Sequence, residues 1–303
     1  MKSNDLHDVI IIGGSYAGLS AALSLGRSLR KVLIIDSNNP CNKQAPFAHN
    51  FLTNDGINPQ ELRNKARLQL SQYNTVSLLE GLAIDVVSQE NYFVVITENS
   101  EKFSSKKVLF ATGVTDTIPN IKGFNECWGI SVLHCPYCHG YEVKQLKTGV
   151  LGNADLGFEL AKIISHWTDD LTLYTNGTST LSPEEVLKLN KHNIKVVENE
   201  IDHIEHENGY IKKLHFKDTP PDEMEALYTQ LPFMQQCSLP EKLGCEFTEK
   251  GFISVNKCLE STVNGVFGAG DCLSLFRSIA HAVAQGNKAG AIINKCLIEE
   301  EFQ

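Results

Sequence analysis

The sequence predicts an α/β protein that contains two Rossmann-like nucleotide-binding units. Residues 8–37 and residues 148–177 each follow the order of buried strand, glycine-containing turn, helix and second strand. Between these segments lies a run in which apolar and polar residues alternate, a pattern typical of antiparallel strands. At 303 residues, with 42% hydrophobic and 21% charged residues, the chain is long enough for two globular domains.

The composition argues against several classes of partner. The net charge is −9 and the lysines and arginines are scattered, so the sequence predicts binding neither to nucleic acid nor to an anionic membrane. The uncharged apolar run Val9–Gly14 is too short for a signal-peptide core or a membrane span, and we expect a cytoplasmic protein. The chain has nine cysteines, of which only one pair has motif spacing. This pattern favours a specific redox or metal pair over a secreted disulfide scaffold.

The first unit carries a dinucleotide fingerprint in which serine replaces the second glycine. Its predicted elements are the strand Val9–Ile12, the helix Ser20–Leu29 and the strand Val32–Ile35. Gly13 permits a tight turn, the small Ser15 lets a pyrophosphate approach the helix N-terminus, and Gly18 allows close helix–strand packing. Asp36 follows the second strand, where an acid can bind a ribose hydroxyl. This segment therefore predicts dinucleotide binding.

The second unit has the same order of elements but a poorer fingerprint. Its predicted elements are the strand Gly149–Leu151, the turn Gly152–Gly157, a helix from Phe158 and the strand Leu171–Gly177. Asn153 and Ala154 occupy the turn, and the last strand runs through Tyr174–Asn176 with neither an acid for a ribose nor an arginine for a 2′-phosphate. We expect the second unit to adopt the nucleotide-binding fold. Its residues are equally consistent with a working nicotinamide site and with one that has lost the ability to bind the cofactor.

Two further segments complete the predicted architecture. The alternation over residues 76–110 predicts an antiparallel meander that closes on the strand Val108–Phe110. Near the end of the chain, a short strand leads into the turn Gly268–Asp271 and then into a long helix rich in alanine and glycine. Small residues on such a helix permit close packing and carry no chemistry by themselves.

The hexapeptide HCPYCH, residues 134–139, holds two cysteines whose spacing suits either zinc or redox chemistry. Zinc requires four ligands, and no second Cys-x-x-Cys lies nearby; His203 and His206 belong to an acidic segment that we expect to be a solvated turn. Glutaredoxins share Cys-Pro-Tyr-Cys but place it after the first strand of a small fold of their own. The third interpretation is the redox disulfide of a larger enzyme.

Together these landmarks resemble the low-molecular-weight thioredoxin reductase family, the class II FAD-dependent pyridine nucleotide-disulphide oxidoreductases. The matching residues are Gly13–Gly18, ATG at 111–113, the Cys-x-x-Cys at 135–138 and GVFGAGD at 265–271. The resemblance implies two Rossmann-like, three-layer ββα domains, the second inserted into the first. It implies an FAD-binding domain over 1–114 and 247–303, and an NAD(P)H-binding-like domain over 115–246 that carries the Cys-x-x-Cys.

The resemblance also implies a set of FAD contacts. The pyrophosphate would bind the first glycine turn, the adenosine ribose Asp36 and the ribityl chain Asp271, with Gln44 and Asn50 near the flavin. The expected cofactor-binding residues are Gly13, Gly14, Ser15, Ala17, Gly18, Asp36, Gln44, Asn50, Thr112, Gly113, Gly270, Asp271, Ser278 and Ile279. Ser278 and Ile279 stand where the family has Gln-Ala beside the isoalloxazine, so only their backbone groups are carried over.

For the dithiol, the resemblance implies a disulfide coupled to the flavin, with Cys138 facing the flavin and Cys135 exchanging with the substrate. The family's dithiol is followed by an aspartate that relays protons, and His139 stands in its place. Because histidine titrates near neutral pH, we expect His139 to act as the acid/base group. We expect no metal at this site.

The electron donor is the second departure from the family. The His-Arg-Arg clamp that holds NADPH in the family is missing at Tyr174–Asn176, which argues against NADPH. Ferredoxin or another flavin is the alternative donor. Both departures resemble the gliotoxin-type dithiol oxidases and the reductases of this fold that use ferredoxin or another flavin.

We therefore expect an FAD-dependent dithiol/disulfide oxidoreductase that is a homodimer, as the family implies. Its partner would be a thioredoxin-like protein or a small disulfide or dithiol. One alternative is a dithiol oxidase that passes electrons from a small dithiol to oxygen. Another is a non-catalytic flavin redox sensor or binding protein, which would change its redox state once and then stop.

Overall fold

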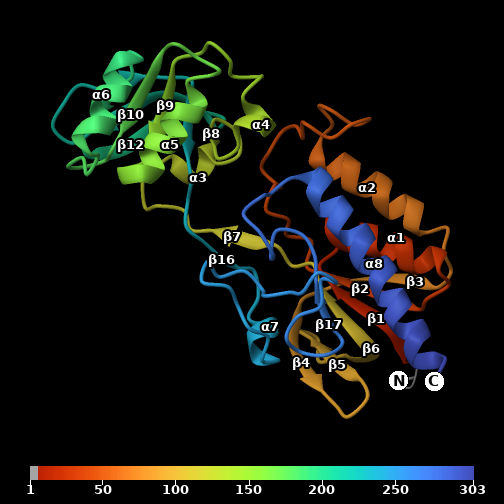
Figure 1. Cartoon of the computed structure of the whole chain (residues 1–303). Coiled ribbons are helices and arrows are strands. Elements are labelled where there is room, and N and C mark those ends of the chain that lie inside the picture. Colours follow the sequence, from red (N-terminus) through yellow and green to blue (C-terminus); the bar gives the residue numbers. More distant parts are fainter. Residues whose placement is uncertain (1–5) are drawn as a thin grey trace. The chain divides into compact units, whose positions relative to one another are not determined.

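The computed structural model describes residues 6–303, which divide into two compact units (Figure 1). The first unit contains residues 6–43, 51–115 and 233–303, and the second contains residues 44–50 and 116–232. We expected the inserted domain to extend to residue 246. Residues 233–246 instead belong to the first unit, because Leu239 and Cys245 are buried in one of its core clusters.

A seven-stranded sheet, counted over the described residues, forms the centre of the first unit, in the order β3-β2-β1-β6-β5-β4 with β17 also paired to β6. The pairs among β3, β2, β1, β6 and β17 are parallel, whereas β4, β5 and β6 form an antiparallel meander. The strands are β1 (His7–Ile12), β2 (Val32–Asp36), β3 (Val76–Glu80), β4 (Ala83–Ser88), β5 (Phe93–Thr97), β6 (Lys102–Phe110) and β17 (Val266–Gly268).

The expected meander over residues 76–110 is thus correct for β4 to β6 and wrong for β3, which pairs in parallel with β2. Alternation of apolar and polar residues shows that a strand has two different faces, but it does not specify the partner strand.

Helices cover one face of the parallel strands, and the antiparallel strands β4 and β5 pack against the other face, which gives three layers. Val9 and Ile11 point toward the helices, whereas Ile10 and Ile12 pack in the core cluster that contains the meander residues. The helices on that face are α1 (Tyr16–Arg27), α2 (Pro59–Leu70) and α8 (Ile279–Glu301), whereas the short helix α7 (Leu239–Lys242) packs on the meander side through Leu239. A Cβ atom on Gly286 of α8 would overlap the carbonyl oxygen of Ala17, so α8 lies directly on α1 (Figure 1).

The second unit repeats the three-layer plan around a five-stranded parallel sheet in the order β11-β10-β9-β15-β8, again counted over the described residues. Its strands are β8 (Val132–Leu133), β9 (Thr148–Leu151), β10 (Leu171–Tyr174), β11 (Lys195–Val197) and β15 (Ala226–Thr229). Leu160 of α5 (Ala154–Ile164) and Leu189 of α6 (Pro183–Lys191) pack on one face. On the other face lie α3 (Phe124–Cys127) and a sheet of β12 (Ile201–Glu207), β13 (Tyr210–Phe216) and β14 (Asp222–Glu223).

The predicted α/β class with two parallel-sheet units is therefore confirmed. His203 and His206 lie on strand β12, so the solvated turn expected there is wrong; Ile201 and Ile204 anchor that strand in the core. The short strands β7 (Val114–Asp116) and β16 (Phe233–Gln235) pair with each other. No helix within residues 6–303 has both the length and the apolarity that a membrane crossing requires.

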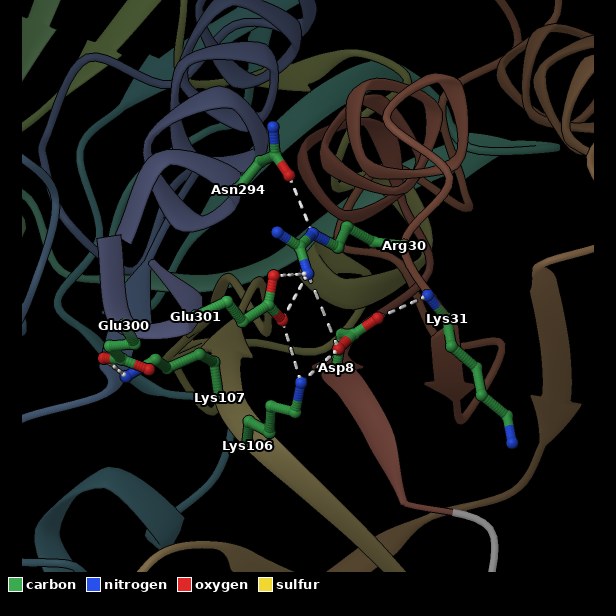
Figure 2. A network of polar contacts seen from close by, with 8 residues as sticks. All are labelled: Asp8, Arg30, Lys31, Lys106, Lys107, Asn294, Glu300 and Glu301. Atoms are coloured by element: carbon green, nitrogen blue, oxygen red, sulfur yellow. Dashed lines mark hydrogen bonds and ion pairs between the residues drawn. The ribbon is translucent and has the colours of Figure 1, made fainter. Parts of the chain in front are cut away.

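A cluster of charged residues joins the first and last elements of the first unit (Figure 2). The Arg30 guanidinium donates to both carboxylate oxygens of Glu301 at 2.7 and 2.9 Å. Lys106 of β6 bridges Glu301 at 3.0 Å and Asp8 of β1 at 2.9 Å (Figure 2). We call Asp8, Arg30, Lys106 and Glu301 the terminal charge cluster. It ties the last turn of α8 to strands β1 and β6.

The terminal charge cluster predicts a pH-dependent contribution to stability. Arg30 and Lys106 lower the pKa of Glu301 from 4.5 to about 2. A carboxylate whose pKa is lower in the folded state stabilises that state above its unfolded pKa, and the contribution is lost as the pH falls through the folded pKa. We expect Glu301→Gln to lower the thermal midpoint at pH 6–7, and the difference from wild type to shrink between about pH 5 and pH 2.

Thermal midpoints of the two proteins across this pH range test the prediction. Glu299→Gln is the matched control, since Glu299 pairs with Lys295 of the same exposed helix face. An equal effect of both substitutions at every pH would contradict a role for the cluster.

Candidate active site

The two cysteines of the hexapeptide lie where strand β8 ends. Cys135 is the N-cap of the one-turn helix α4 (Pro136–His139), and Cys138 lies within that helix. Their sulfur atoms are 2.6 Å apart, and both side chains are half-buried. Residues three apart on a helix share a face, so this short turn brings the thiols together without help from another element. The pair can form and break an internal disulfide.

Aromatic side chains pack around the dithiol helix. The Tyr137 ring meets the Trp167 ring edge to face, with centroids 5.7 Å apart. A Cβ atom on Gly140 would lie 2.7 Å from Trp167 Nε1, so glycine is needed for the indole to pack against the helix. Tyr137 and Tyr141 are 66% and 71% exposed, and Lys144 Nζ lies 3.4 Å from the Tyr141 ring centroid. A disulfide substrate that approaches the dithiol helix would meet two exposed aromatic rings.

His139 is in an electrostatic environment that differs from the one we expected. Burial, and secondly repulsion from His49, lower the pKa of His139 from 6.5 to about 4. His49 Nδ1 in turn lies 3.5 Å from the Glu142 carboxylate. The His139 imidazole is therefore neutral at neutral pH, where it can accept a proton but holds none of the charge of an imidazolium.

The first glycine turn is shaped for an anionic group. Gly13 has φ +108°, and a Cβ atom there would overlap the carbonyl oxygen of Ala111; a Cβ atom on Gly18 would overlap the carbonyl oxygen of Gly13. Ser15 is the N-cap of α1 and makes no side-chain cap hydrogen bond, and the first turn of α1 contains no acidic residue. The turn therefore brings the chain close to the positive end of a helix dipole, as binding of a pyrophosphate requires.

Asp36 lies at the carboxyl end of β2, beside this turn. It is 7% exposed, and its Oδ2 atom accepts a hydrogen bond from Nη2 of Arg67 on α2 at 2.5 Å. A Cβ atom on Gly14 would lie 2.7 Å from the Asp36 Cβ atom, so the turn and the carboxylate are in direct contact. Asp36 is thus held in one orientation, as recognition of a ribose hydroxyl requires.

The other expected residues of the first unit follow β6 and β17. Thr112 and Gly113 follow β6 after one intervening residue, and Gly113 has φ +69° with no atom within 4 Å of an added Cβ. Gly270 has φ +87°, and its amide donates to Gln285 Oε1 at 2.7 Å. Because the carboxyl ends of parallel strands meet at one edge of a sheet, these residues share that edge with the first glycine turn.

Two further expectations concern the start of helix α8. Asp271 Oδ2 lies 3.7 Å from Arg277 Nε, which ties the Gly-Ala-Gly-Asp turn to the residues before the helix. Ser278 is the N-cap of α8, and its Oγ atom accepts a hydrogen bond from the His281 amide at 3.1 Å. Ile279 is the first helical residue. The Ser278 hydroxyl therefore has a structural partner, and a cofactor contact would use the backbone here.

Gln44 and Asn50 lie in the second unit, and not in the unit that holds the first glycine turn. The Gln44 Cβ atom would lie 3.9 Å from a Cβ atom on Gly129, and His49 pairs with Glu142. These contacts assign the segment 44–50 to the dithiol-bearing unit, although the sequence on either side belongs to the first.

The second glycine turn keeps the close approach of Gly157 to Gly152 but differs from the first in its helix cap and charge. Asn153 is the N-cap of α5, and its Oδ1 atom accepts hydrogen bonds from the amides of Ala154 and Thr180, each at 2.9 Å. Its Nδ2 atom donates to the Thr178 carbonyl oxygen at 2.9 Å. Asp155 adds a negative charge to the first turn of α5. The end of the helix that would bind a pyrophosphate is therefore capped by the chain itself and carries an acid.

The surroundings of this turn are also poorly suited to a 2′-phosphate. Tyr174, at the end of β10, is buried and donates its hydroxyl hydrogen bond to Asp222 Oδ2 at 3.0 Å. Residues 115–246 contain no arginine. A nicotinamide dinucleotide thus does not fit this site.

Comparison with known proteins places the chain in a family. Residues 7–286 match the family described as pyridine nucleotide-disulphide oxidoreductase. The chain belongs to this family. The oxidoreductase is 29% identical to thioredoxin reductase tcpT of Claviceps purpurea over 319 residues, which cover 99% of this chain and 97% of that protein.

Solved structures agree with this assignment. A proposed thioredoxin reductase, TrxB of Bacillus anthracis, superimposes with a TM-score of 0.94 and 30% identity, covering 97% of this chain and 99% of that one. An oxidoreductase from Agrobacterium tumefaciens gives a TM-score of 0.91 and 34% identity with the same coverage. The oxidoreductase is therefore a thioredoxin reductase-like, FAD-dependent disulfide oxidoreductase, as predicted.

Two buried thiols of the oxidoreductase contrast with the dithiol. Burial raises the pKa of Cys127 to about 11 and that of Cys272 to about 12, so both are neutral and unreactive at physiological pH. Among residues 6–303, no three or more His, Cys, Asp or Glu side chains are grouped in a way that could hold a metal ion.

Sequence reasoning missed three residues near the dithiol: His49, Glu142 and Tyr228. His49 and Glu142 are far apart in sequence, and no motif links them. Tyr228 lies in the apolar strand Ala226–Thr229, and the sequence of this strand indicates only that its residues belong to the hydrophobic core. The only sequence signal for Tyr228 is that a tyrosine in a buried strand requires a partner for its hydroxyl.

Proposed function

We propose that Cys135 and Cys138 are the dithiol through which this oxidoreductase exchanges two electrons between FAD and a substrate disulfide or dithiol. The observation that carries the proposal is the 2.6 Å distance between the two sulfur atoms at the end of β8. The contrast with the buried thiols Cys127 and Cys272 supports it, because a thiol must be accessible to exchange with a substrate.

In the reducing direction, the Cys135 thiolate attacks one sulfur of the substrate disulfide, forms a mixed disulfide and releases the other substrate sulfur as a thiolate. Cys138 then loses its proton and attacks the Cys135 sulfur. The Cys135–Cys138 disulfide forms, and the second substrate sulfur leaves as a thiolate. The substrate gains two electrons and the dithiol loses two. FAD, when bound, would supply the electron pair that restores the dithiol in the reducing direction, and would accept an electron pair from the dithiol in the oxidising direction.

His139 is the proposed acceptor for the Cys138 proton. It directly follows Cys138, and its neutral imidazole has a free lone pair at neutral pH because its pKa is about 4. Such a low pKa makes His139 a weak base that passes the proton on quickly. Its titration would therefore leave no inflection between pH 6 and pH 8.

The proposed FAD site belongs to the first unit. The pyrophosphate would bind the turn formed by Gly13, Gly14, Ser15, Ala17 and Gly18, and the ribose would bind Asp36. Thr112, Gly113, Gly270 and Asp271 would contact the rest of the cofactor, and Ser278 and Ile279 would do so through backbone groups. Gln44 and Asn50 remain candidates from the second unit. The open glycine turn and the oriented Asp36 support this assignment.

A second candidate function is favoured by the Asn153 cap on α5. If no nicotinamide binds there, a substrate dithiol is itself a suitable electron source, and the enzyme works as a dithiol oxidase with oxygen as the acceptor. A thioredoxin-like protein or a small disulfide is the substrate in the reducing direction, with ferredoxin or another flavin as donor. A homodimer and a cytoplasmic location complete the proposal.

Anaerobic mixing of the FAD-loaded protein with different reductants tests the donor. We expect a small dithiol or reduced ferredoxin to bleach the visible flavin absorbance, and NADPH and NADH to leave it unchanged over the same time. Rapid bleaching by NADPH would contradict our interpretation of the Asn153 cap. A single oxidation of the dithiol without continued turnover in air would instead indicate a sensor.

A further inference from the structure

Tyr228 has a buried hydroxyl group that nothing in the described chain satisfies. The residue is 1% exposed, and its hydroxyl oxygen is buried without a hydrogen-bond partner among residues 6–303. Buried hydroxyl groups almost always have a partner, because an unsatisfied one costs folding free energy. Tyr228 is therefore an exception that calls for a functional explanation.

The position of Tyr228 in the sheet places it beside the dithiol. On strand β15 it is paired with Leu133 of β8 on one side and with Val150 of β9 on the other. Cys135 follows Leu133 by two residues. The Tyr228 ring belongs to the same core cluster as Val143, which comes four residues after His139. Residues before and after the dithiol helix thus pack around this ring.

The charges near the hydroxyl come from the dithiol region. Burial raises the pKa of Tyr228 above its ordinary value, and negative charge on Cys135, Glu142 and Cys138 raises it further, in that order. The hydroxyl consequently stays protonated at neutral pH, and it can donate a hydrogen bond to an anion. Glu142 already faces His49 at 3.5 Å, and Cys135 is the anion with the largest effect on the Tyr228 hydroxyl.

We propose that the Tyr228 hydroxyl donates a hydrogen bond to the Cys135 thiolate when the Cys135–Cys138 pair is reduced, and thereby stabilises the sulfur that attacks the substrate. In the structure the two sulfurs lie against each other, and the hydroxyl has no partner. The two cysteines are not joined by a disulfide bond, and ionisation of Cys135 creates the anion that accepts this hydrogen bond. The hydroxyl keeps its proton throughout, so no bond is broken in this step.

Few other groups compete for the hydroxyl. The titratable groups that affect Tyr228 or His139 include Cys135, Cys138, His49 and Glu142, and His134 lies beside Cys135 in the sequence. His139 is uncharged at neutral pH, and His49 and Glu142 face each other. The rest of the core cluster around the ring is apolar: Leu133, Val150, Leu160, Ala161, Ile164, Leu171, Leu173, Leu189 and Ile194. The hydrogen bond would therefore form in surroundings of low dielectric constant, where a bond to a thiolate is strong.

The test measures thiol ionisation, because the inference rests on the proposed role of the dithiol and has to be separable from it. In the FAD-loaded, full-length Cys138→Ser protein, the rate of carbamidomethylation of Cys135 by iodoacetamide is followed against pH by mass spectrometry. Adding Tyr228→Phe is expected to move the midpoint of this profile up by about 1 to 2 pH units, the size of one hydrogen bond to a charged group. Turnover is not needed for this readout.

Two comparisons make the result specific. Tyr174→Phe is the matched control, because Tyr174 is equally buried in the same sheet but its hydroxyl is bound to Asp222. We expect it to leave the Cys135 midpoint unchanged. In the Cys135→Ser background, Tyr228→Phe is expected to move the Cys138 midpoint less than it moves that of Cys135. An unchanged Cys135 midpoint, an equal shift from Tyr174→Phe, or a larger shift at Cys138 would each overturn the proposal.

Folding of the variant gives a second measurement. Because the Tyr228 hydroxyl has no partner in the structure, Tyr228→Phe is expected to keep or raise the thermal midpoint. Tyr174→Phe is expected to lower it, because this substitution removes the hydrogen bond to Asp222. If Tyr228→Phe fails to fold, the hydroxyl has a structural partner and the proposal is wrong.

Discussion

Cys135→Ser and Cys138→Ser are each expected to lower disulfide turnover by roughly 10³-fold or more, since a serine hydroxyl cannot take part in disulfide exchange. The two variants should differ in what they accumulate. Cys138→Ser retains the attacking sulfur but lacks the resolving one, so it should hold the substrate as a stable mixed disulfide on Cys135. Cys135→Ser should form no such adduct. Steady-state turnover and intact-protein mass spectrometry measure the two effects.

Cys258→Ser is the matched control for this prediction. Cys258 is exposed and lies in the first unit, in a turn where its amide donates to Asn256 Oδ1. Its loss is expected to change neither turnover nor FAD content. Wild-type turnover in Cys138→Ser would refute the proposed role of the dithiol in both the reductase and the oxidase direction.

Gly18→Ala is expected to cause loss of FAD and to destabilise the first unit by about 3 kcal/mol, the upper range for an overpacked core position. The added Cβ atom would overlap the carbonyl oxygen of Gly13, and Ile11 Cγ2 would lie only 3.2 Å away on the other side. Neither atom can move without shifting strand β1 or the turn. The measurements are the ratio of flavin to protein after purification and the free energy of unfolding in urea.

Gly81→Ala controls for a glycine substitution as such. Gly81 lies in the turn between β3 and β4 of the same unit, and the nearest atom to its added Cβ is the flexible Glu98 Oε1 at 3.9 Å. We expect normal FAD content and stability. If Gly18→Ala also retains the cofactor and its stability, the close approach of α1 to β1 is not required for binding.

Much of the architecture could be predicted because it rests on local patterns. The buried run before Gly13 and the acid after the next strand both have short-range signatures, and β1, α1 and β2 lie where the periodicity placed them, within a few residues at the helix start. Strand β3 was misjudged because the choice between a parallel and an antiparallel partner depends on residues far along the chain.

The site was less predictable, because its properties arise from tertiary contacts. The spacing of Cys135 and Cys138 is visible in the sequence, whereas the low pKa of His139 depends on burial and on His49, some ninety residues earlier. The Asn153 cap likewise depends on the loop that brings Thr180 to the end of α5. The sequence motif shows that a glycine turn is present, but only the folded structure shows that the Asn153 side chain already caps the helix that follows it.

Strand β6 imposes an order on the biosynthesis of the first unit. One edge of β6 pairs with β1, and the other pairs with β5 near residue 105 and with β17 near residue 109. The ribosome makes β17 only after the whole inserted unit. Until then, the carboxyl half of β6 has an open hydrogen-bonding edge of the kind that recruits other strands. A nascent chain stalled before residue 266 is therefore the form of this protein most exposed to aggregation.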